Sequence, residues 1–528
     1  METTEVLIIG AGPTGLVLAL WLVRKGVRVR IVDQAEEPGT SSRALAVVPR
    51  TLELYRQLGI ADAVVERGLK LAAANMWINA KQVGRVELGD IGAGLSPFPF
   101  ILIFPQDEHE QLLIDQLEGR GVFVERPTTL QSFQVRGDHV VAQLRDAYGV
   151  VRQCESSYLA GCDGARSSVR HAIDATFPGG TYSHLFYVAD VEASGPLVNH
   201  EVNVALDDAS FLGVFPFAEK DHVRLIGTVR EDAAMRGESL GWDDVSSEAL
   251  DRLRMDVTRV SWFSTYHVHH RVASHFQKGR VFILGDAAHI HSPVGGQGMN
   301  TGIGDAVNLG WKLASVLRKG ASPALLDTFQ AERIGFAQRL VATTDRIFQL
   351  ATSDKRLTTY VRTKLVPRIS SAVLARRAMR RLAFRTMSQT RIEYRTSRLS
   401  EGSAGRVHGG DRLPWVPGDA KAGVPDNYQA LASLDWQLHV YGIASPELRA
   451  EAASQRIPLH VFPWRPAAAR AGLEENAAYL VRPDGHVGWA DVEARAAALA
   501  RYVRANAIAS TPALRPSPSP APARAPRP

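Results

Sequence analysis

The first part of the chain alternates short apolar runs with one apolar helical segment. Residues 6–9 and 27–32 are apolar runs that predict strands, and residues 16–24 repeat apolar side chains at helical spacing. The turn between the first strand and the helix reads Gly10-Ala11-Gly12-Pro13-Thr14-Gly15, a G-x-G-x-x-G sequence, and the second strand ends at Asp33. This order predicts a dinucleotide-binding unit in which Asp33 accepts hydrogen bonds from a ribose.

A second glycine-rich region follows another apolar run. Residues 281–284 predict a strand that ends at Gly285-Asp286, and a helical pattern runs from about residue 300 to residue 317. Between them stand Pro293, Gly295, Gly296 and Gly298. Glycines let main-chain N–H groups approach a flat ligand, and a helix N-terminus carries partial positive charge. The region therefore predicts a ligand platform.

Changes of pattern divide the chain into parts. The fold class predicted is α/β in a mixed arrangement, with a Rossmann-like dinucleotide-binding domain, an inserted strand-rich domain and a C-terminal α/β domain. The expected boundaries are 1–180 with 271–350 for the first domain, 181–270 for the inserted sheet, 351–404 for a basic helical connector, 405–505 for the C-terminal domain and 506–528 for a disordered tail rich in proline and alanine.

Composition narrows the class of protein. The chain has 528 residues, 45% of them hydrophobic, and a formal charge of +6. Residues 355–398 hold thirteen Lys and Arg and one acidic residue, so the positive charge is confined to one segment. That segment is either a contact for an anionic membrane surface or acidic partner, or a connecting helix with solvated arginines. No reader motif for nucleic acid accompanies it.

Other features exclude several kinds of site. The sequence has no apolar run long enough to span a bilayer and no signal peptide, so we expect a cytoplasmic protein. Its two cysteines, Cys154 and Cys162, lack metal-ligand spacing, and we expect no metal. The C-terminal domain contains no cysteine, which excludes thiol redox chemistry there and leaves packing or homodimer contacts as its role.

The motifs together resemble a known family. The chain is similar to class A, single-component FAD-dependent aromatic monooxygenases, the p-hydroxybenzoate hydroxylase-like family, and in particular to the phenol, chlorophenol and polyketide hydroxylase branch. The C-terminal domain resembles the thioredoxin-like domain appended to many of these enzymes. The resemblance is carried by residues 10–15, 158–170 with Asp163-Gly164, and 285–300, and by the shorter matches 42–54, 105–113 and 326–333.

This resemblance implies a cofactor and a reaction. It implies non-covalent FAD, NAD(P)H as a transient co-substrate, and O2 that hydroxylates an aromatic substrate through a C4a-hydroperoxyflavin, with displacement of a ring substituent as a variant. The residues expected to bind cofactor are Gly10, Gly12, Pro13, Thr14, Gly15, Asp33, Arg43, Gln106, Asp163, Gly285, Asp286, Pro293, Gly298, Met299 and Asn300.

The sequence indicates less clearly which residues contact the substrate or remove its proton. Phe211, Phe215 and Phe217 alternate along one strand, which fits either a substrate-facing surface or core packing, and Gly295 and Gly296 would adjoin the substrate. Candidates for the base that deprotonates a phenol are Tyr266, His267 and His289, with His269, His270 and His291 nearby, although a structural or exposed position is the commoner role for each of them. Two other functions stay open: an FAD oxidoreductase without oxygen insertion, similar to prenyl reductases, and a non-catalytic flavin-binding partner.

Overall fold

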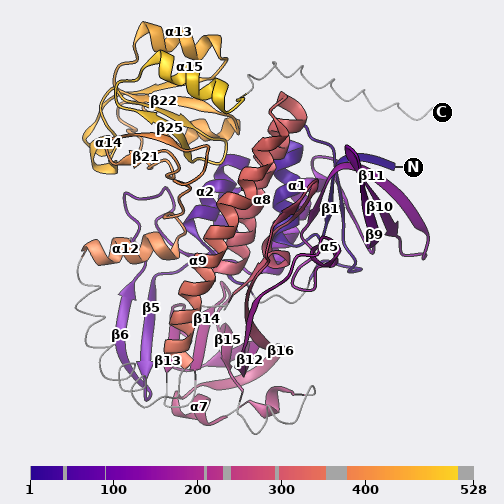
Figure 1. Cartoon of the computed structure of the whole chain (residues 1–528). Helices are drawn as coiled ribbons and strands as arrows, with labels where there is room; N and C mark the ends of the chain where they lie inside the picture. The colour runs from indigo at the N-terminus through magenta and orange to yellow at the C-terminus, as the bar shows by residue number, and fades with distance from the viewer. Residues whose placement is uncertain are drawn as a thin grey trace, which may run out of the picture.

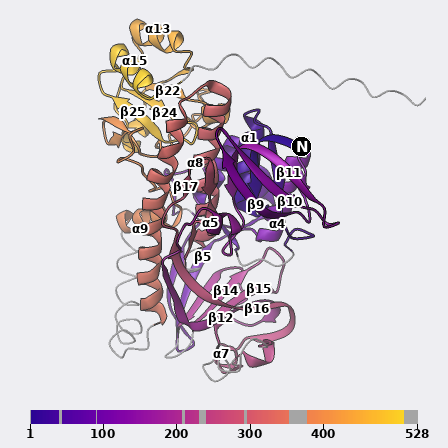
Figure 2. The ribbon, with the colours of Figure 1, turned by 45° about the vertical axis from the view of Figure 1, so that its right-hand side comes forward.

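The structure is a computed structural model. It describes residues 2–39, 44–89, 91–206, 211–229, 240–245, 247–291, 296–352 and 377–508. Within these ranges the fold is mixed α/β, as the sequence predicts. It comprises three larger sheets and a small three-stranded sheet. The C-terminal domain lies at one end of the molecule and the second sheet at the other, with the long helices α8 (Gln297–Lys319) and α9 (Asp327–Thr352) between them (Figures 1 and 2).

The first sheet is built on parallel strands from distant parts of the sequence. Strand β1 (Glu2–Ile9) pairs in parallel with β2 (Val29–Val32) and β11 (Val151–Gly161), and β11 pairs in parallel with β18 (Val281–Ile283). The edges are completed by β8 (Val124–Glu125), β9 (Thr129–Arg136), β10 (His139–Arg145) and β17 (Gln277–Lys278). Because parallel strands end at one edge, the turns after β1 and β18 lie at the same edge of the sheet.

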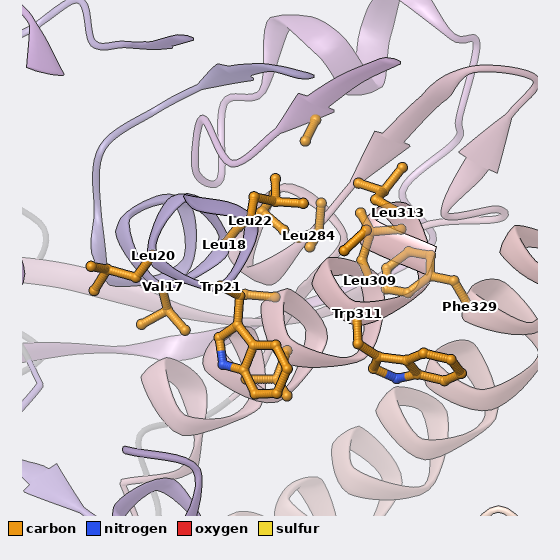
Figure 3. Packing of buried hydrophobic residues seen from close by; sticks show 14 of the residues in the cluster. Val17, Leu18, Leu20, Trp21, Leu22, Leu284, Leu309, Trp311, Leu313 and Phe329 are labelled. Atoms are coloured by element: carbon orange, nitrogen blue, oxygen red, sulfur yellow. The ribbon is translucent and has the colours of Figure 1, made fainter. Parts of the chain in front are cut away.

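Helices α1 (Pro13–Arg24) and α8 pack closely on this sheet. Small residues of α8 set the distance: a Cβ at Gly310 would lie 3.1 Å from Cβ of Trp21 on α1. Figure 3 shows Leu18 and Leu22 of α1 beside Leu284, which follows β18. The same domain contains α2 (Pro49–Leu58), α3 (Ala61–Arg67), α4 (Gln106–Glu118), α5 (Ser168–Ala172) and the small sheet of β3 (Ala46–Val47), β4 (Leu69–Lys70) and β7 (Leu102–Ile103).

The second sheet has eight strands in the order β19-β16-β12-β15-β14-β13-β5-β6. Its long central strands are β12 (Gly179–Ser194) and β16 (Asp256–Val272), beside β13 (Val202–Leu206), β14 (Phe211–Pro216) and β15 (His222–Thr228). Strand β5 (Ala73–Ile78) and the edge strand β6 (Lys81–Glu87) come from the first 180 residues, and the other edge strand, β19 (His289–Ile290), follows β18. One face is covered by α7 (Ser247–Arg252), where Leu250 of the helix and Leu253 just after it belong to one buried cluster with Tyr187 and Leu225.

The C-terminal domain is a βαβ unit followed by an antiparallel hairpin and a helix. Strand β22 (Gln437–Tyr441), helix α13 (Pro446–Ser454) and strand β23 (Leu459–Phe462) form the parallel unit. Strands β24 (Ala478–Val481) and β25 (Val487–Asp491) extend the sheet antiparallel to β22, and α15 (Ala496–Ala505) follows. This is a thioredoxin-like order of elements, and β20 (Glu401–Ala404), β21 (Val407–His408) and α14 (Pro466–Ala471) complete the domain.

The basic segment and the tail are described only in part. Helix α12 (Arg377–Met387) is the portion of the basic connector that the structure describes, and it packs through Phe384, whose ring lies against Gly92. Residues 353–376 and 509–528 lie outside the described residues. No helix among the described residues is long and apolar enough to cross a membrane.

Candidate functional site

The first glycine turn is fixed by two contacts that allow no side chain. Gly10 has φ +101°, and a Cβ there would lie 2.3 Å from the carbonyl oxygen of Cys162. A Cβ at Gly15 would lie 2.0 Å from the carbonyl oxygen of Gly10. At Gly12, by contrast, a Cβ would meet nothing within 4 Å. The turn is therefore closed on the protein side and open at Gly12, where α1 begins without a side-chain cap.

Asp33 closes the same turn from the end of β2. Its carboxylate accepts hydrogen bonds from the backbone N–H of Ala11 at 2.7 Å and of Ala35 at 2.9 Å, and it lies 3.3 Å from Arg126. The carboxylate is thus oriented at the edge of the sheet beside the open turn. That is the position in which an acidic side chain can accept hydrogen bonds from ribose hydroxyls in a dinucleotide fold.

The second glycine region meets the first at Thr14. A Cβ at Gly285 would lie 2.7 Å from Thr14 Oγ1, and a Cβ at Gly302 on α8 would lie 2.3 Å from the same atom. Gly285 and Gly296 both have positive φ, +58° and +61°, and α8 starts after Gly296 without a side-chain cap. The N-termini of α1 and α8 therefore lie close to one another around Thr14, and backbone N–H groups at helix N-termini fit the anionic pyrophosphate of FAD and the edge of a flavin that becomes negative on reduction.

Asn300 fastens the start of α8 to the segment before α2. Its side-chain oxygen accepts from Val48 N–H and Thr51 Oγ1, and its amide donates to the carbonyl oxygens of Ala46 and Gly296. The side chain is 1% exposed, so all four bonds are made inside the protein. Asn300 therefore supports the glycine-rich region from the interior of the protein. The neighbouring Gly298 and the half-buried Met299 lie in the first turn of the helix.

The remaining cofactor candidates have different surroundings. Asp163 accepts from Ser167 and Ser168 hydroxyls and from Val169 N–H, so it caps the short helix α5. Gln106 donates to Glu110 within α4. Asp286 is exposed in the turn after β18. Arg43, Pro293 and Gly295 lie outside the described residues.

Sequence reasoning missed Asp305, which holds the second turn in place. Its Oδ2 accepts from Gly285 N–H at 3.0 Å and lies 2.7 Å from His289 Nε2, and its Oδ1 accepts from Arg333 Nε at 2.5 Å. Burial alone would raise the pKa of this carboxyl, but the charges of Arg333 and His289 lower it. A carboxylate within an otherwise buried stretch of helix was the only available signal.

The three phenylalanines do not share one environment. Phe211 packs with Phe186 and Tyr266, whereas Phe215 and Phe217 belong to a cluster with Leu45, Ile103 and Val202, between the small sheet and strand β13. By the strand register, Phe211, Gly213 and Phe215 lie on one face of β14, opposite the face that α7 covers. Both Phe211 and Phe215 are partly exposed there, so this face presents aromatic side chains toward the first domain.

The candidate bases separate by position. His289 is 1% exposed and bonded to Asp305, and His267 is exposed opposite Leu185, on the face covered by α7. His269 bonds to Thr181. On the opposite face of β16 lie Tyr266 and His270, while the ring of His291 lies 3.8 Å from where a Cβ of Gly298 would be.

His270 has a charged neighbour on α9. Its Nδ1 lies 4.0 Å from Asp345 Oδ1, and its ring centroid lies 4.9 Å from that of Tyr182, whose hydroxyl donates to the same carboxylate. Burial and the neighbouring Asp345 carboxylate raise the pKa of Tyr182 above its ordinary value, so this hydroxyl stays protonated. Among the described residues no group of acidic, cysteine or histidine side chains could hold a metal ion.

Comparison with known proteins agrees with this architecture. Residues 3–344 match the family model described as an FAD binding domain, and residues 409–507 match the model described as the C-terminal domain of aromatic-ring hydroxylases. A 6-methylpretetramide 4-monooxygenase of Streptomyces rimosus is 34% identical over 92% of this chain and 90% of its own length. A pentachlorophenol 4-monooxygenase of Sphingobium chlorophenolicum is 30% identical over 78% of this chain and 75% of its own.

A solved structure extends the similarity to three dimensions. An anhydrotetracycline hydroxylase from Streptomyces rimosus has a TM-score of 0.77 and 27% identity, covering 95% of this chain and 99% of its own. Both the dinucleotide-binding part and the C-terminal domain are included in these matches. The chain therefore belongs to the FAD-binding family of aromatic-ring hydroxylases, and it is an FAD-dependent aromatic monooxygenase.

Proposed function

We propose that this enzyme hydroxylates a phenolic ring of a fused, polyketide-type aromatic substrate, with NAD(P)H and O2 as co-substrates. The observation that carries the proposal is similarity along nearly the whole chain, C-terminal domain included, to the 6-methylpretetramide 4-monooxygenase. The pentachlorophenol 4-monooxygenase matches a smaller share of both chains. The aromatic face with Phe211 and Phe215 supports a flat substrate, because stacking and apolar contact favour ring systems.

The residues around the glycine turns have distinct tasks in this proposal. When bound, FAD would supply the redox chemistry, with NAD(P)H as the reductant and O2 as the source of the oxygen atom that is added to the ring. The N–H donors at the start of α1, together with Asp33 and Asp286, hold the pyrophosphate and ribose portions. The N-terminus of α8 stabilises negative charge at the pyrimidine edge of the flavin. The apolar side chains of β14 exclude water from the reacting ring.

We also assign the proton acceptor. His270 lies on the face of the second sheet that points toward the first domain, and the Asp345 carboxylate can stabilise the positive charge that its ring gains with a proton. His267, three residues earlier, points to the other face. His270 is therefore the better candidate for taking the phenol proton, acting directly or through water. The homodimer and the cytoplasmic location expected from the sequence stay predictions.

The test is a substrate panel with two readouts. Substituted phenols and fused polyketide phenols are added to the FAD-loaded enzyme, while NAD(P)H oxidation and O2 consumption are followed together. We expect fused phenols to stimulate NAD(P)H oxidation most, with one O2 consumed per hydroxylated product. Stimulation without oxygen incorporation would indicate an oxidoreductase, and preference for single-ring phenols would overturn the proposed substrate class.

A further inference from the structure

A cluster of charged side chains is buried where α8 and α9 meet the C-terminal domain. Glu332 of α9 pairs with Lys312 of α8 at 2.8 Å and with Arg482 of the C-terminal domain at 2.7 Å, and all three side chains are 0% exposed. Arg482 also pairs with Asp484, whose carboxylate accepts from Trp311 Nε1 of α8. Buried charges are tolerated only when they are paired and hydrogen-bonded, so this contact fixes both partners in one geometry.

Arg333, which follows Glu332 in α9, connects this charged cluster to the Gly285–Asp286 turn through Asp305. Arg333 donates through Nε to Asp305, through Nη2 to the carbonyl oxygen of Thr301, and through Nη1 to the hydroxyl of Tyr394 at 2.9 Å. The Nε and Nη2 donors are thus directed at residues in the first three turns of α8. Asp305 in turn binds Gly285 N–H.

Tyr394 is held by the C-terminal domain. Its N–H donates to the carbonyl oxygen of Gly410, its ring centroid lies 4.5 Å from that of His486, and the guanidinium of Arg482 lies 5.2 Å from the ring. Beside it is a cavity of about 20 Å³, enough for about one water molecule, lined on one side by Asn300 and on the other by His486. A continuous set of contacts thus joins the hairpin of the C-terminal domain to Gly285.

These contacts connect a thioredoxin-like domain without cysteine to the glycine turns of the first domain. A carboxylate buried like Asp305 keeps its orientation only while its cationic partner is in place, and Arg333 is placed by Tyr394 as well as by α8. Gly285 and Thr14 are packed against each other, so a displacement of Asp305 is passed to both glycine turns.

We propose that the C-terminal domain is a structural part of the flavin site: through Tyr394 and Arg333 it positions Asp305, and Asp305 holds the Gly285–Asp286 turn in the conformation that binds FAD. Tyr394, Arg333 and Asp305 are positioning residues, none of which needs to touch the reacting ring. The inference rests on the FAD site described above and adds a role for the C-terminal domain that involves no thiol chemistry.

The experiment compares two conservative changes in buried tyrosines. Tyr394→Phe removes the hydroxyl that Arg333 uses and keeps the ring. The matched control, Tyr428→Phe, removes a buried hydroxyl that donates to Leu413 inside the same domain. FAD affinity is measured by fluorescence titration of the apoprotein, FAD release by dilution of the holoprotein, and melting temperature on both forms.

We expect Tyr394→Phe to weaken FAD binding about tenfold, since a buried charged donor loses its acceptor, and to alter the visible flavin absorption band. Tyr428→Phe should lower the melting temperature similarly and leave the FAD dissociation constant within twofold of the wild type. Arg333→Lys, which keeps the charge but loses the planar fork, should weaken FAD binding at least as much as Tyr394→Phe.

Equal FAD affinity in Tyr394→Phe, Arg333→Lys and the wild type would overturn the proposal, as would equal weakening by Tyr394→Phe and Tyr428→Phe. Neither result would touch the proposed function, which depends on wild-type turnover. If a variant yields no folded apoprotein, its FAD release rate from holoprotein purified in excess FAD decides the comparison.

Discussion

The variant Gly12→Ala tests whether the first glycine turn binds FAD, separately from whether the turn folds. Gly12 has φ −74° and ψ −179°, a conformation open to any residue, and a Cβ there meets nothing within 4 Å. In the folded apoprotein, Gly12→Ala should therefore cost only the difference in helix N-cap preference, about 0.5–1 kcal/mol. The same methyl would occupy the open side of the α1 N-terminus, where we place the pyrophosphate. We expect the FAD dissociation constant to rise at least tenfold, or about 1.4 kcal/mol.

Gly15→Ala provides the contrast within the same turn. Helix propensity alone would make alanine about 1 kcal/mol more stable than glycine at this helical position. The structure reverses that sign, because the new Cβ would lie 2.0 Å from the Gly10 carbonyl oxygen and no side-chain rotation relieves a backbone contact. Overpacking of this kind costs about 1–3 kcal/mol or more, so we expect a clear loss of stability.

Urea unfolding of the two apoproteins gives a free energy of unfolding for each variant, and fluorescence titration with FAD gives a dissociation constant for each. The reasoning predicts a stable Gly12→Ala protein that binds FAD weakly and a destabilised Gly15→Ala protein. Wild-type FAD affinity in Gly12→Ala would refute the placement of the pyrophosphate at α1. Wild-type stability in Gly15→Ala would refute the packing of the turn.

Three further changes test other parts of the molecule. Asp286→Ala should weaken FAD binding by about one to two decades, the cost of losing a polar contact that bound FAD would cover, while Cys162→Ala should retain FAD. Equal retention in flavin titrations would contradict the assignment. His270→Gln should lower kcat about a hundredfold, whereas His267→Gln should leave kcat unchanged in the same turnover assay. Burial lowers the pKa of His439 to about 3, so the unfolded chain takes up a proton below pH 6.5 that the native ring does not. The free energy of unfolding should then fall by about 1.4 kcal/mol per pH unit between pH 6.5 and 3, and His439→Gln should show a shallower fall in urea titrations at pH 7 and pH 5.

The glycine turns could be predicted from sequence because their requirement is local. Gly15 is required by its contact with Gly10 in the same strand-turn-helix unit, the positive φ of Gly10 is a property of that turn, and Asp33 lies at the end of the next strand. The family motifs and the thioredoxin-like order of the C-terminal domain follow from short segments as well. These features need no knowledge of which distant residues meet.

The sorting of the histidines could not be predicted, since the face on which each lies depends on strand register. Strand β16 pairs with β12 through several register shifts, one of them between Thr181 and Leu185, close to the histidines. A shift of one residue moves every side chain to the other face. Alternation in the sequence places His270 and His267 on opposite faces of a strand, but it could not say which of the two faces the first domain.

The buried ion pairs were beyond sequence reasoning for a different reason. Arg482 and Glu332 are separated by 150 residues, and Asp305 and Arg333 by 28, so no periodic pattern relates them. In the sequence, each of these residues is a charged side chain on a helix or in a turn, and such side chains are ordinarily exposed to solvent. Their burial becomes visible only when the C-terminal domain is packed on α8 and α9, and that packing turns a domain without redox residues into a support for the flavin-binding turn.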